Sequence, residues 1–309
     1  MGIMLDEQQL TYKMNTARDL YDQNKVLHAL QVYLSILEDN PDYFPAIIKI
    51  TEIYQVLGNI EPAIELLNEQ IEENPDNKEL RIFYGQFLFN NKKWEQVVEV
   101  LSYILPEEEP AISFFTGYSY FMLKDFELAK HNFLNFINHQ EHTGLIHEAY
   151  LYLSKIYIEL NNFERALVYA KKIESIYNDF WELSFMLAKI YYNLDMYAHG
   201  VGPIEKAIKL NPSESLVYEW GGKIYLKIHE YIKAENNFLK CIEMNENISA
   251  EAYNNLAEAY YNNGKFSEAL SYYELALRIE PDNKIASVGK ENVLRIPNIN
   301  IILDGNAQG

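Results

Sequence analysis

The chain has little of several things that other protein classes need. A single cysteine, Cys241, allows no internal disulfide and gives thiolate metal or redox centres no framework. Glycine and proline number only 13 and 10 in 309 residues, a scarcity of turn formers that favours a helical protein. Basic residues are also few, 26 against 45 acidic ones, for a net charge of −19. No stretch supplies the clustered lysines and arginines that nucleic acid or anionic lipid requires. The acidity predicts a highly soluble surface or a preference for basic partners.

Targeting and membrane signals are missing too. The N-terminal stretch MGIMLDEQQLTYKM has no basic region followed by an apolar run, and no apolar segment reaches membrane-spanning length. Asp6 stands where a myristoylation signal after Gly2 needs serine or threonine. We therefore expect a cytoplasmic protein without membrane insertion, or a periplasmic one if a leader has been removed.

Aromatic residues are abundant, with 25 tyrosines and 15 phenylalanines, which argues against disorder. Residues 250–283 contain two short apolar-periodic helices, separated at Gly264 and closed at Pro281. Similar segments run upstream almost to the N-terminus, so the sequence predicts a repeat array. The predicted repeats are 10–43, 44–77, 78–109, 110–146, 147–180, 181–214, 215–249 and 250–283. Residues 1–9 form a lead-in, residues 284–296 a capping helix and residues 297–309 a tail.

Two positions of the repeat hold only small residues, apart from one valine and one threonine of modest size. The eighth position holds Ala17, Thr51, Gly85, Gly117, Ser154, Ala188, Gly222 and Ala257. The twentieth holds Ala29, Ala63, Val97, Ala129, Ala166, Gly200, Ala234 and Ala269. Two helices approach closely only where their side chains are small, so these columns predict the contact inside each hairpin. The eleventh and twenty-fourth positions are mostly large and apolar, which indicates core.

This pattern resembles the tetratricopeptide repeat, W-x2-L-G-x2-Y, then A-x3-F, then P, over residues 10–283. Tryptophan is absent from the start of the motif, and four repeats lack the closing proline. The resemblance implies an all-α, right-handed solenoid of about eight helical hairpins with a capping helix. It also implies that the second, fifth, ninth and twelfth positions of the first helices line a concave groove for protein binding.

The groove positions hold a repeated cation and several aromatic residues. Lys155, Lys189 and Lys223 occupy the ninth position of three consecutive repeats. The further candidate contacts are Phe114, Tyr118, Phe121, Phe185 and Tyr192. One interpretation is a peptide or helix partner with acidic side chains beside apolar anchors. The alternative is that Glu148, Glu182 and Glu219 neutralise the lysines as ordinary ion pairs between helices, worth little each. The lysine and asparagine set of a chaperone-tail carboxylate clamp does not map onto these repeats.

Signals for chemistry are weak. His131, His139, His142 and His147 lie near Glu141, but Gly144 interrupts the helix that a shared metal would need, so we expect solvated loop residues. We predict no catalytic residue, metal or cofactor. The fourth repeat is long around residues 138–144, and the third is short near the acidic run 107–109, which we interpret as local changes of pitch.

The sequence predicts a non-enzymatic scaffold or adaptor that binds a protein segment. One alternative is the regulatory or substrate-recruiting arm of a larger enzyme that continues beyond Gly309; another is a self-associating assembly factor. The tail contains Ile299, Ile301, Ile302 and Leu303, which would suit a short strand, a docking segment, the stub of a missing domain, or a frayed end on the cap.

Overall fold

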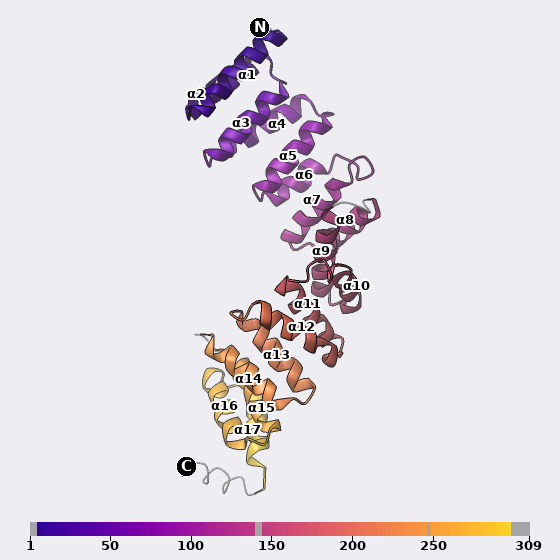
Figure 1. Cartoon of the computed structure of the whole chain (residues 1–309), viewed down its shortest axis with the longest axis vertical. Helices are drawn as coiled ribbons and strands as arrows, with labels where there is room; N and C mark the ends of the chain where they lie inside the picture. Colours follow the sequence, from indigo (N-terminus) through magenta and orange to yellow (C-terminus); the bar gives the residue numbers. More distant parts are fainter. Residues whose placement is uncertain (1–4, 140–143, 246–247, 298–309) are drawn as a thin grey trace. The chain divides into compact units, whose positions relative to one another are not determined.

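The computed structural model describes residues 5–139, 144–245 and 248–297, which form seventeen α-helices and contain no strand. Successive helices are joined by short turns and stack as hairpins (Figure 1). The predicted all-α solenoid is confirmed, whereas its right-handed sense and the number of repeats stay predictions. Contacts divide the chain into two compact units, Met1–His139 and Gln140–Gly309, and the division falls in the long stretch of the fourth predicted repeat.

The first unit contains eight helices. They are α1 (Glu7–Asp22), α2 (Val26–Asp39), α3 (Phe44–Val56), α4 (Glu61–Glu73), α5 (Lys78–Asn90), α6 (Trp94–Leu101), α7 (Ala111–Met122) and α8 (Phe126–His139). The first begins inside the expected lead-in because Asp6 caps it: the Asp6 carboxylate accepts from the Gln9 backbone, and the Gln9 side chain accepts from the Asp6 backbone.

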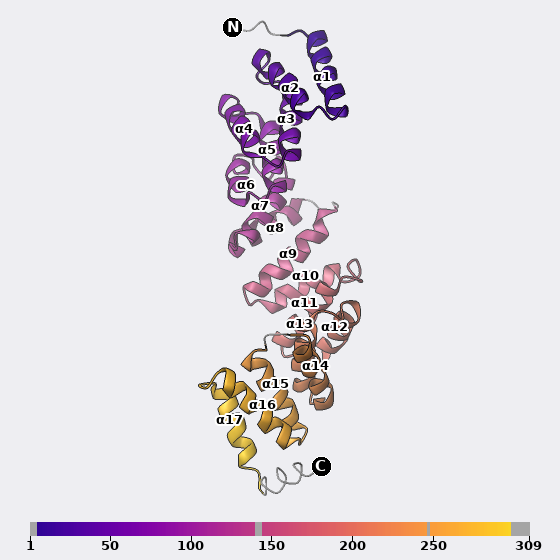
Figure 2. The same ribbon diagram turned by 90° about the vertical axis from the view of Figure 1, so that its left-hand side faces the viewer.

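The second unit contains nine helices within its described residues. They are α9 (Leu145–Glu159), α10 (Phe163–Ile173), α11 (Trp181–Asn193), α12 (Tyr197–Leu210), α13 (Ser215–Lys227), α14 (Tyr231–Glu243), α15 (Ala250–Asn262), α16 (Phe266–Ile279) and α17 (Lys284–Leu294). The turned view in Figure 2 shows the last of these, in yellow, lying along the α15–α16 hairpin. The tail segment with Ile299, Ile301, Ile302 and Leu303 lies outside the described residues.

Every hairpin turns in the same way. The residue at the fifteenth position of each predicted repeat has a positive φ, between 54° and 76°, which ends the first helix in a left-handed cap. These residues are Asn24, Gly58, Lys92, Lys124, Asn161, Asp195, His229 and Gly264. The next backbone N–H then donates to the carbonyl at the eleventh position over 2.8 to 3.2 Å in all eight turns. From the sequence, only the turns that contain glycine or two adjacent asparagines could be predicted.

The two small-residue columns are buried without exception, from Ala17 in α1 to Ala269 in α16. Glycine in the first helix accompanies a bulky partner at the twenty-fourth position of the second. A Cβ built on Gly222 would lie 2.4 Å from the Phe238 ring, and one on Gly85 would lie 2.3 Å from Leu101. Where the first helix has Ser154, the corresponding residue is Ala170, and the serine hydroxyl donates to the Ala166 carbonyl over 2.9 Å. In these hairpins, a small side chain at one of the two positions accompanies a larger one at the other, so the space between the two helices is filled within each hairpin.

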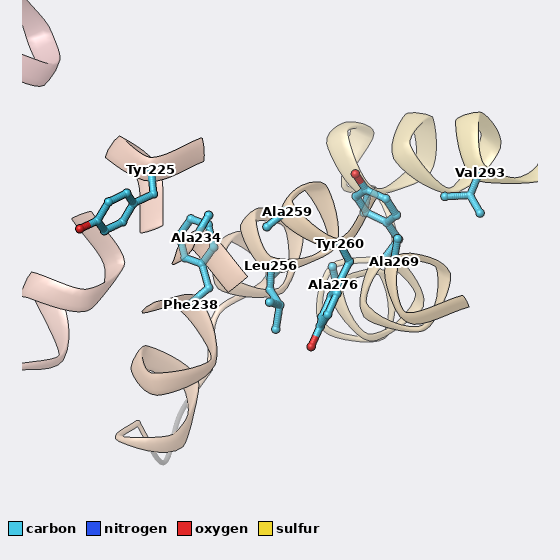
Figure 3. Close-up of a cluster of buried hydrophobic side chains, with 13 residues drawn as sticks. Tyr225, Ala234, Phe238, Leu256, Ala259, Tyr260, Ala269, Ala276 and Val293 are labelled. Carbon is cyan, nitrogen blue, oxygen red and sulfur yellow. The ribbon is translucent and has the colours of Figure 1, made fainter. Parts of the chain in front are cut away.

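The core of the C-terminal part continues from α13 to α17. Figure 3 shows Tyr225 and Phe238 at one side of this cluster, Leu256 and Tyr260 within it, and Val293 of the last helix at the other side. The last helix has completely buried residues at Ala286 and Val293, so it covers the apolar face of the α15–α16 hairpin.

We expect Gly222→Ala to lower the free energy of unfolding by about 1–3 kcal/mol, because the added methyl overlaps the Phe238 ring. Adding Phe238→Leu should recover part of this loss, giving a coupling of about 1 kcal/mol in a double-mutant cycle. Urea unfolding of the four proteins measures it. Strict additivity of the two changes would show that the two side chains do not meet.

The turns provide a second prediction. Replacing Lys124, whose φ is 62°, with glycine should raise the unfolding free energy by about 0.5–1 kcal/mol, because a left-handed conformation is unfavourable for a side chain with a Cβ. The mirror change, Gly264→Ala at a φ of 76°, should lower it by about 1 kcal/mol. Thermal unfolding of both variants is the measurement, and equal signs for the two changes would refute the turn assignment.

Candidate binding face on the first helices

The candidate residues fall in both units. Phe114, Tyr118 and Phe121 lie on α7 of the first unit, and the other five lie on α9, α11 and α13 of the second. Phe114 is only 6% exposed and packs against Phe133 and Phe136, so its side chain belongs to the core. Tyr118 is half-buried and contacts the rings of Phe89 and Trp94, and Phe121 contacts Phe126.

In the second unit, Trp220 of α13 joins two of the predicted lysines. The Nζ atoms of Lys189 and Lys223 lie 5.2 and 5.3 Å from the centre of its ring, within the range of cation–π attraction. Tyr192 and Phe185 of α11 also meet this ring edge-on, at centroid distances of 5.4 and 6.3 Å. Four of the five candidates in this unit are thus gathered around a tryptophan that the sequence analysis did not single out.

Lys223 is fully engaged. Its Nζ lies 2.5 Å from Glu219, one turn earlier on the same helix, and 3.0 Å from Glu251 on α15. Burial lowers the pKa of this lysine, but the two carboxylates outweigh burial and hold its pKa above the ordinary value. The pairing alternative is therefore correct for Lys223, although the partner on the neighbouring helix is Glu251 rather than a residue named from the sequence.

Lys155 and Lys189 differ from Lys223, since neither forms an ion pair with any residue that the structure describes. Lys155 is largely enclosed and has its Nζ 5.3 Å from the Tyr152 ring. Burial lowers its pKa, and the more distant charge of Glu182 offsets this only in part. Glu182 and Glu148 each keep one buried carboxylate oxygen without a hydrogen-bond partner. Of the three lysines at the ninth position, two therefore have no carboxylate partner among the described residues, and Lys223 is neutralised.

The first helices of this unit enclose two adjoining hollows. The central hollow, of about 430 Å3, lies between α11, α13 and α15 and is lined by Tyr192, Trp220, Lys223, Leu226, Lys227, His229, Tyr231, Glu251, Asn255, Glu258 and Asn262. The C-terminal hollow, of about 540 Å3, lies between α15 and α17 and is lined by Glu258, Tyr261, Asn262, Tyr273, Lys284, Ile285, Val288, Gly289 and Asn292. Glu258 and Asn262 line both, so the two are continuous along one face.

The lining extends beyond the positions that the resemblance implied. Trp220 and Asn255 stand at the sixth position of their repeats, and Asn262 at the thirteenth. The first unit has a hollow of about 400 Å3 between α1 and α3, where Asn15 and Lys49 again occupy the sixth position. A signal for Trp220 was present, because the chain has only three tryptophans and this one directly precedes a pair of glycines.

A buried carboxylate joins the hairpin α13–α14 to the next hairpin, α15–α16. Glu235 of α14 is 3% exposed, and its two oxygens accept from Lys265 and Asn263, each over 2.6 Å. Both donors lie in or beside the turn between α15 and α16. A buried charge needs such partners, so the cluster ties α14 to the turn between α15 and α16.

Metal-binding groups are not gathered in the part of the chain that the structure describes, where no three histidine, cysteine or acidic residues lie close enough to hold an ion. His142 and Glu141 of the histidine cluster lie outside the described residues. Among the described helices, none combines the length and the apolar character needed to cross a membrane.

The two kinds of lysine should respond oppositely to loss of charge. Lys155→Met should raise the free energy of unfolding at pH 7 by about 1 kcal/mol, because it removes an enclosed cation without a carboxylate partner. Lys223→Met should lower it by about 1–3 kcal/mol, since Glu219 and Glu251 lose their partner. Denaturant unfolding compares them, and destabilisation of equal size by both would mean that Lys155 is paired.

Comparison with known proteins bears on the fold. The family model described as tetratricopeptide repeat matches residues 250–283. No curated protein matches the sequence. Among solved structures, the C-terminal part of a tetratricopeptide-repeat-containing protein from Cytophaga hutchinsonii is 21% identical and has a TM-score of 0.53, over 63% of this chain and 78% of that chain.

Two further structures are similar. Cut9–Hcn1, a hetero-tetramer of the APC/C, is 16% identical with a TM-score of 0.50, over 91% of this chain and 55% of that chain. The MamA protein is 23% identical with a TM-score of 0.50, over 55% of this chain and 91% of that chain. At such identities the likeness concerns the fold alone. Residues 250–283 match the tetratricopeptide repeat, and the chain has the helical repeat fold of the tetratricopeptide repeat proteins.

Proposed function

We propose that the chain is a non-enzymatic scaffold that binds a segment of another protein along the first helices of its second unit. The observation that carries this proposal is that Lys155 and Lys189, at the same position of neighbouring repeats, form no ion pair with any described residue and lie beside aromatic rings, Lys155 against Tyr152 and Lys189 against Trp220. Leaving enclosed charge without a partner is unfavourable for the free protein, so a ligand that supplies the missing carboxylates gains that energy on binding.

The chemistry of the face defines the kind of partner. Tyr192, Trp220 and Leu226 offer apolar contact in the central hollow, and buried aromatic anchors usually contribute most of the affinity in such interfaces. Acidic side chains of the partner would meet Lys155 and Lys189, which set register and association rate. Lys223 is already neutralised by Glu219 and Glu251, so it lines the central hollow but does not offer a free positive charge to the partner.

This assignment narrows the set of contacts expected from the sequence. Lys155, Lys189, Phe185 and Tyr192 remain as direct contacts, Trp220 is added, and Phe114 is assigned to the core. Nucleic acid is a poor ligand for this face, because Glu251 and Glu258 line the central hollow in a chain of net charge −19.

The test is affinity capture from native extract, followed by titration of the captured protein once mass spectrometry has identified it. Reversing both free cations, with Lys155→Glu and Lys189→Glu, should weaken binding at least tenfold, about 1.4 kcal/mol. Raising salt from 0.05 to 0.5 M should weaken the wild-type complex in the same direction, because exposed charge pairs are screened.

A matched control carries the same charge change elsewhere. Lys209 on α12 and Lys240 on α14 are exposed residues on second helices of the same unit. Replacing both with glutamate should leave the affinity for the partner within about twofold of the wild-type value. Circular dichroism and unfolding must show all three proteins equally folded. Equal loss of binding in the control, or full binding by the doubly reversed protein, would remove the proposed site. Light scattering across concentrations separates a monomeric scaffold from a self-associating one.

A further inference from the structure

A buried arginine without a carboxylate partner lines a hollow in the first unit. Arg81 of α5 is only 8% exposed, and its Nε donates to the Pro75 carbonyl over 3.0 Å. Among the residues that the structure describes, the Arg81 guanidinium has no other hydrogen-bond acceptor and no ion pair. A guanidinium keeps its charge at every pH at which proteins fold, and an enclosed charge without a partner is unfavourable. The N–H groups on its Nη atoms are therefore available to an anionic ligand.

The hollow has a volume of about 500 Å3 and is lined by residues of the second helices α4 and α6 and of α5 between them in the sequence. Pockets of this size hold small ligands. Tyr84, which also lines it, is buried, and its hydroxyl already donates to the Asn68 side chain over 2.8 Å. This space, here called the α4–α6 hollow, shares no lining residue with the central or C-terminal hollow of the second unit.

An exposed tyrosine lies against the guanidinium. The Cζ atom of Arg81 is 4.4 Å from the centre of the Tyr103 ring, although Tyr103 itself is 70% exposed. The chain on either side of Tyr103 is anchored, because Leu101 and Ile104 are 2% and 4% exposed and belong to the core of this unit. Cation–π attraction orients the guanidinium without neutralising it. The ring therefore holds Arg81 in place and leaves its N–H groups free for an anion.

Two glutamates give the same hollow a negative side. Glu72 of α4 and Glu99 of α6 are both exposed, line the α4–α6 hollow, and form no ion pair with any described residue. Like charges repel, so these carboxylates disfavour a multiply charged anion such as phosphate beside Arg81. A singly charged carboxylate that carries a cation at its other end would be attracted at both ends.

We propose that the α4–α6 hollow binds a dipolar ligand, in which one carboxylate is joined by a short apolar chain to one ammonium group. The carboxylate accepts hydrogen bonds from the Arg81 guanidinium, whose planar fork matches its two oxygens. The apolar chain lies against Tyr103 and Val100, and the ammonium group meets Glu72 and Glu99. A free ω-amino acid has this chemistry, and so does a lysine at the end of a polypeptide.

This site is independent of the proposed function. It lies within the first unit, uses none of the residues assigned to partner binding, and is tested without a partner protein. Failure of the following experiment would leave the scaffold proposal untouched, and loss of the scaffold proposal would leave this site untouched.

The experiment follows the Arg81 side chain directly in the full chain. The sequence contains five arginines, so nitrogen-15 labelling of arginine gives few Nε–H signals in an NMR spectrum. The Arg81 signal is identified by its shift in Tyr103→Ala, which removes the ring beside it. The probes are 4-aminobutanoate, 6-aminohexanoate and 8-aminooctanoate, each compared with the alkanoate of the same length, together with hexylamine and inorganic phosphate.

At least one ω-amino acid should shift the Arg81 signal and bind about fivefold or more tightly than its matching alkanoate, because its ammonium group adds the contact with the glutamates. Hexylamine and phosphate should bind more weakly than that ω-amino acid. Equal affinities for ω-amino acids and alkanoates, tighter binding of phosphate, or no shift of the Arg81 signal would overturn the proposal. Nα-acetyl-lysine distinguishes the two sources: affinity equal to that of 6-aminohexanoate indicates the end of a polypeptide, and weaker binding indicates a free ω-amino acid.

Charge variants separate the two ends of the ligand. Glu72→Gln with Glu99→Gln should bring the ω-amino acid within about twofold of its alkanoate, without weakening the alkanoate. The matched control, Glu69→Gln with Glu95→Gln, makes the same charge change at exposed positions of α4 and α6 that do not line the hollow, and should keep the preference. An equal loss of preference in the control, or an unchanged preference in the first variant, would show that Glu72 and Glu99 do not bind the ammonium group.

Discussion

The contact between the residue at the eighth position of each repeat, on its first helix, and the second helix opposite it determines most of this structure. A close approach is needed to bury the large residues at positions eleven and twenty-four, and it is available only where the side chains between the helices are small. Gly222 against Phe238 and Ser154 beside Ala170 are two solutions of the same packing problem. A left-handed residue joins the two helices in all eight hairpins, and the backbone N–H after it donates to a carbonyl at the end of the first helix.

Much of the fold could be predicted from the sequence for this reason. The constraint acts on residue size at a fixed spacing. Residue size follows directly from the sequence, as in the series of small residues from Ala17 to Ala269. The turns were harder to predict. Lys92, Lys124 and His229 adopt the same left-handed conformation as Gly58, and nothing in those residue types signals it. Their conformation is imposed by the helices on either side, which makes it a property of the hairpin rather than of the residue.

The candidate face was predicted less well, because its properties depend on distances between helices. Spacing placed Lys189 and Lys223 on one surface, but only the geometry shows that both lie against Trp220 and that Glu251 neutralises one of them. Phe114 and Phe185 stand at the same position of their repeats, yet the first is buried against Phe133 and Phe136 while the second is only partly buried and meets the Trp220 ring edge-on. Whether a lysine on this face is neutralised depends on its neighbours on other helices, and the periodic pattern of the sequence does not specify those neighbours.

The pairing of small and bulky residues inside each hairpin also decides which pieces of the chain are interchangeable. Exchanging α10 with α14 between repeats would set Phe238 against Ser154 and leave Gly222 facing Ala170, producing a clash in one hairpin and a void in the other. Moving a whole hairpin keeps each matched pair together. The indivisible module of this array is therefore two helices with their turn, and duplication or engineered extension would have to copy that module intact.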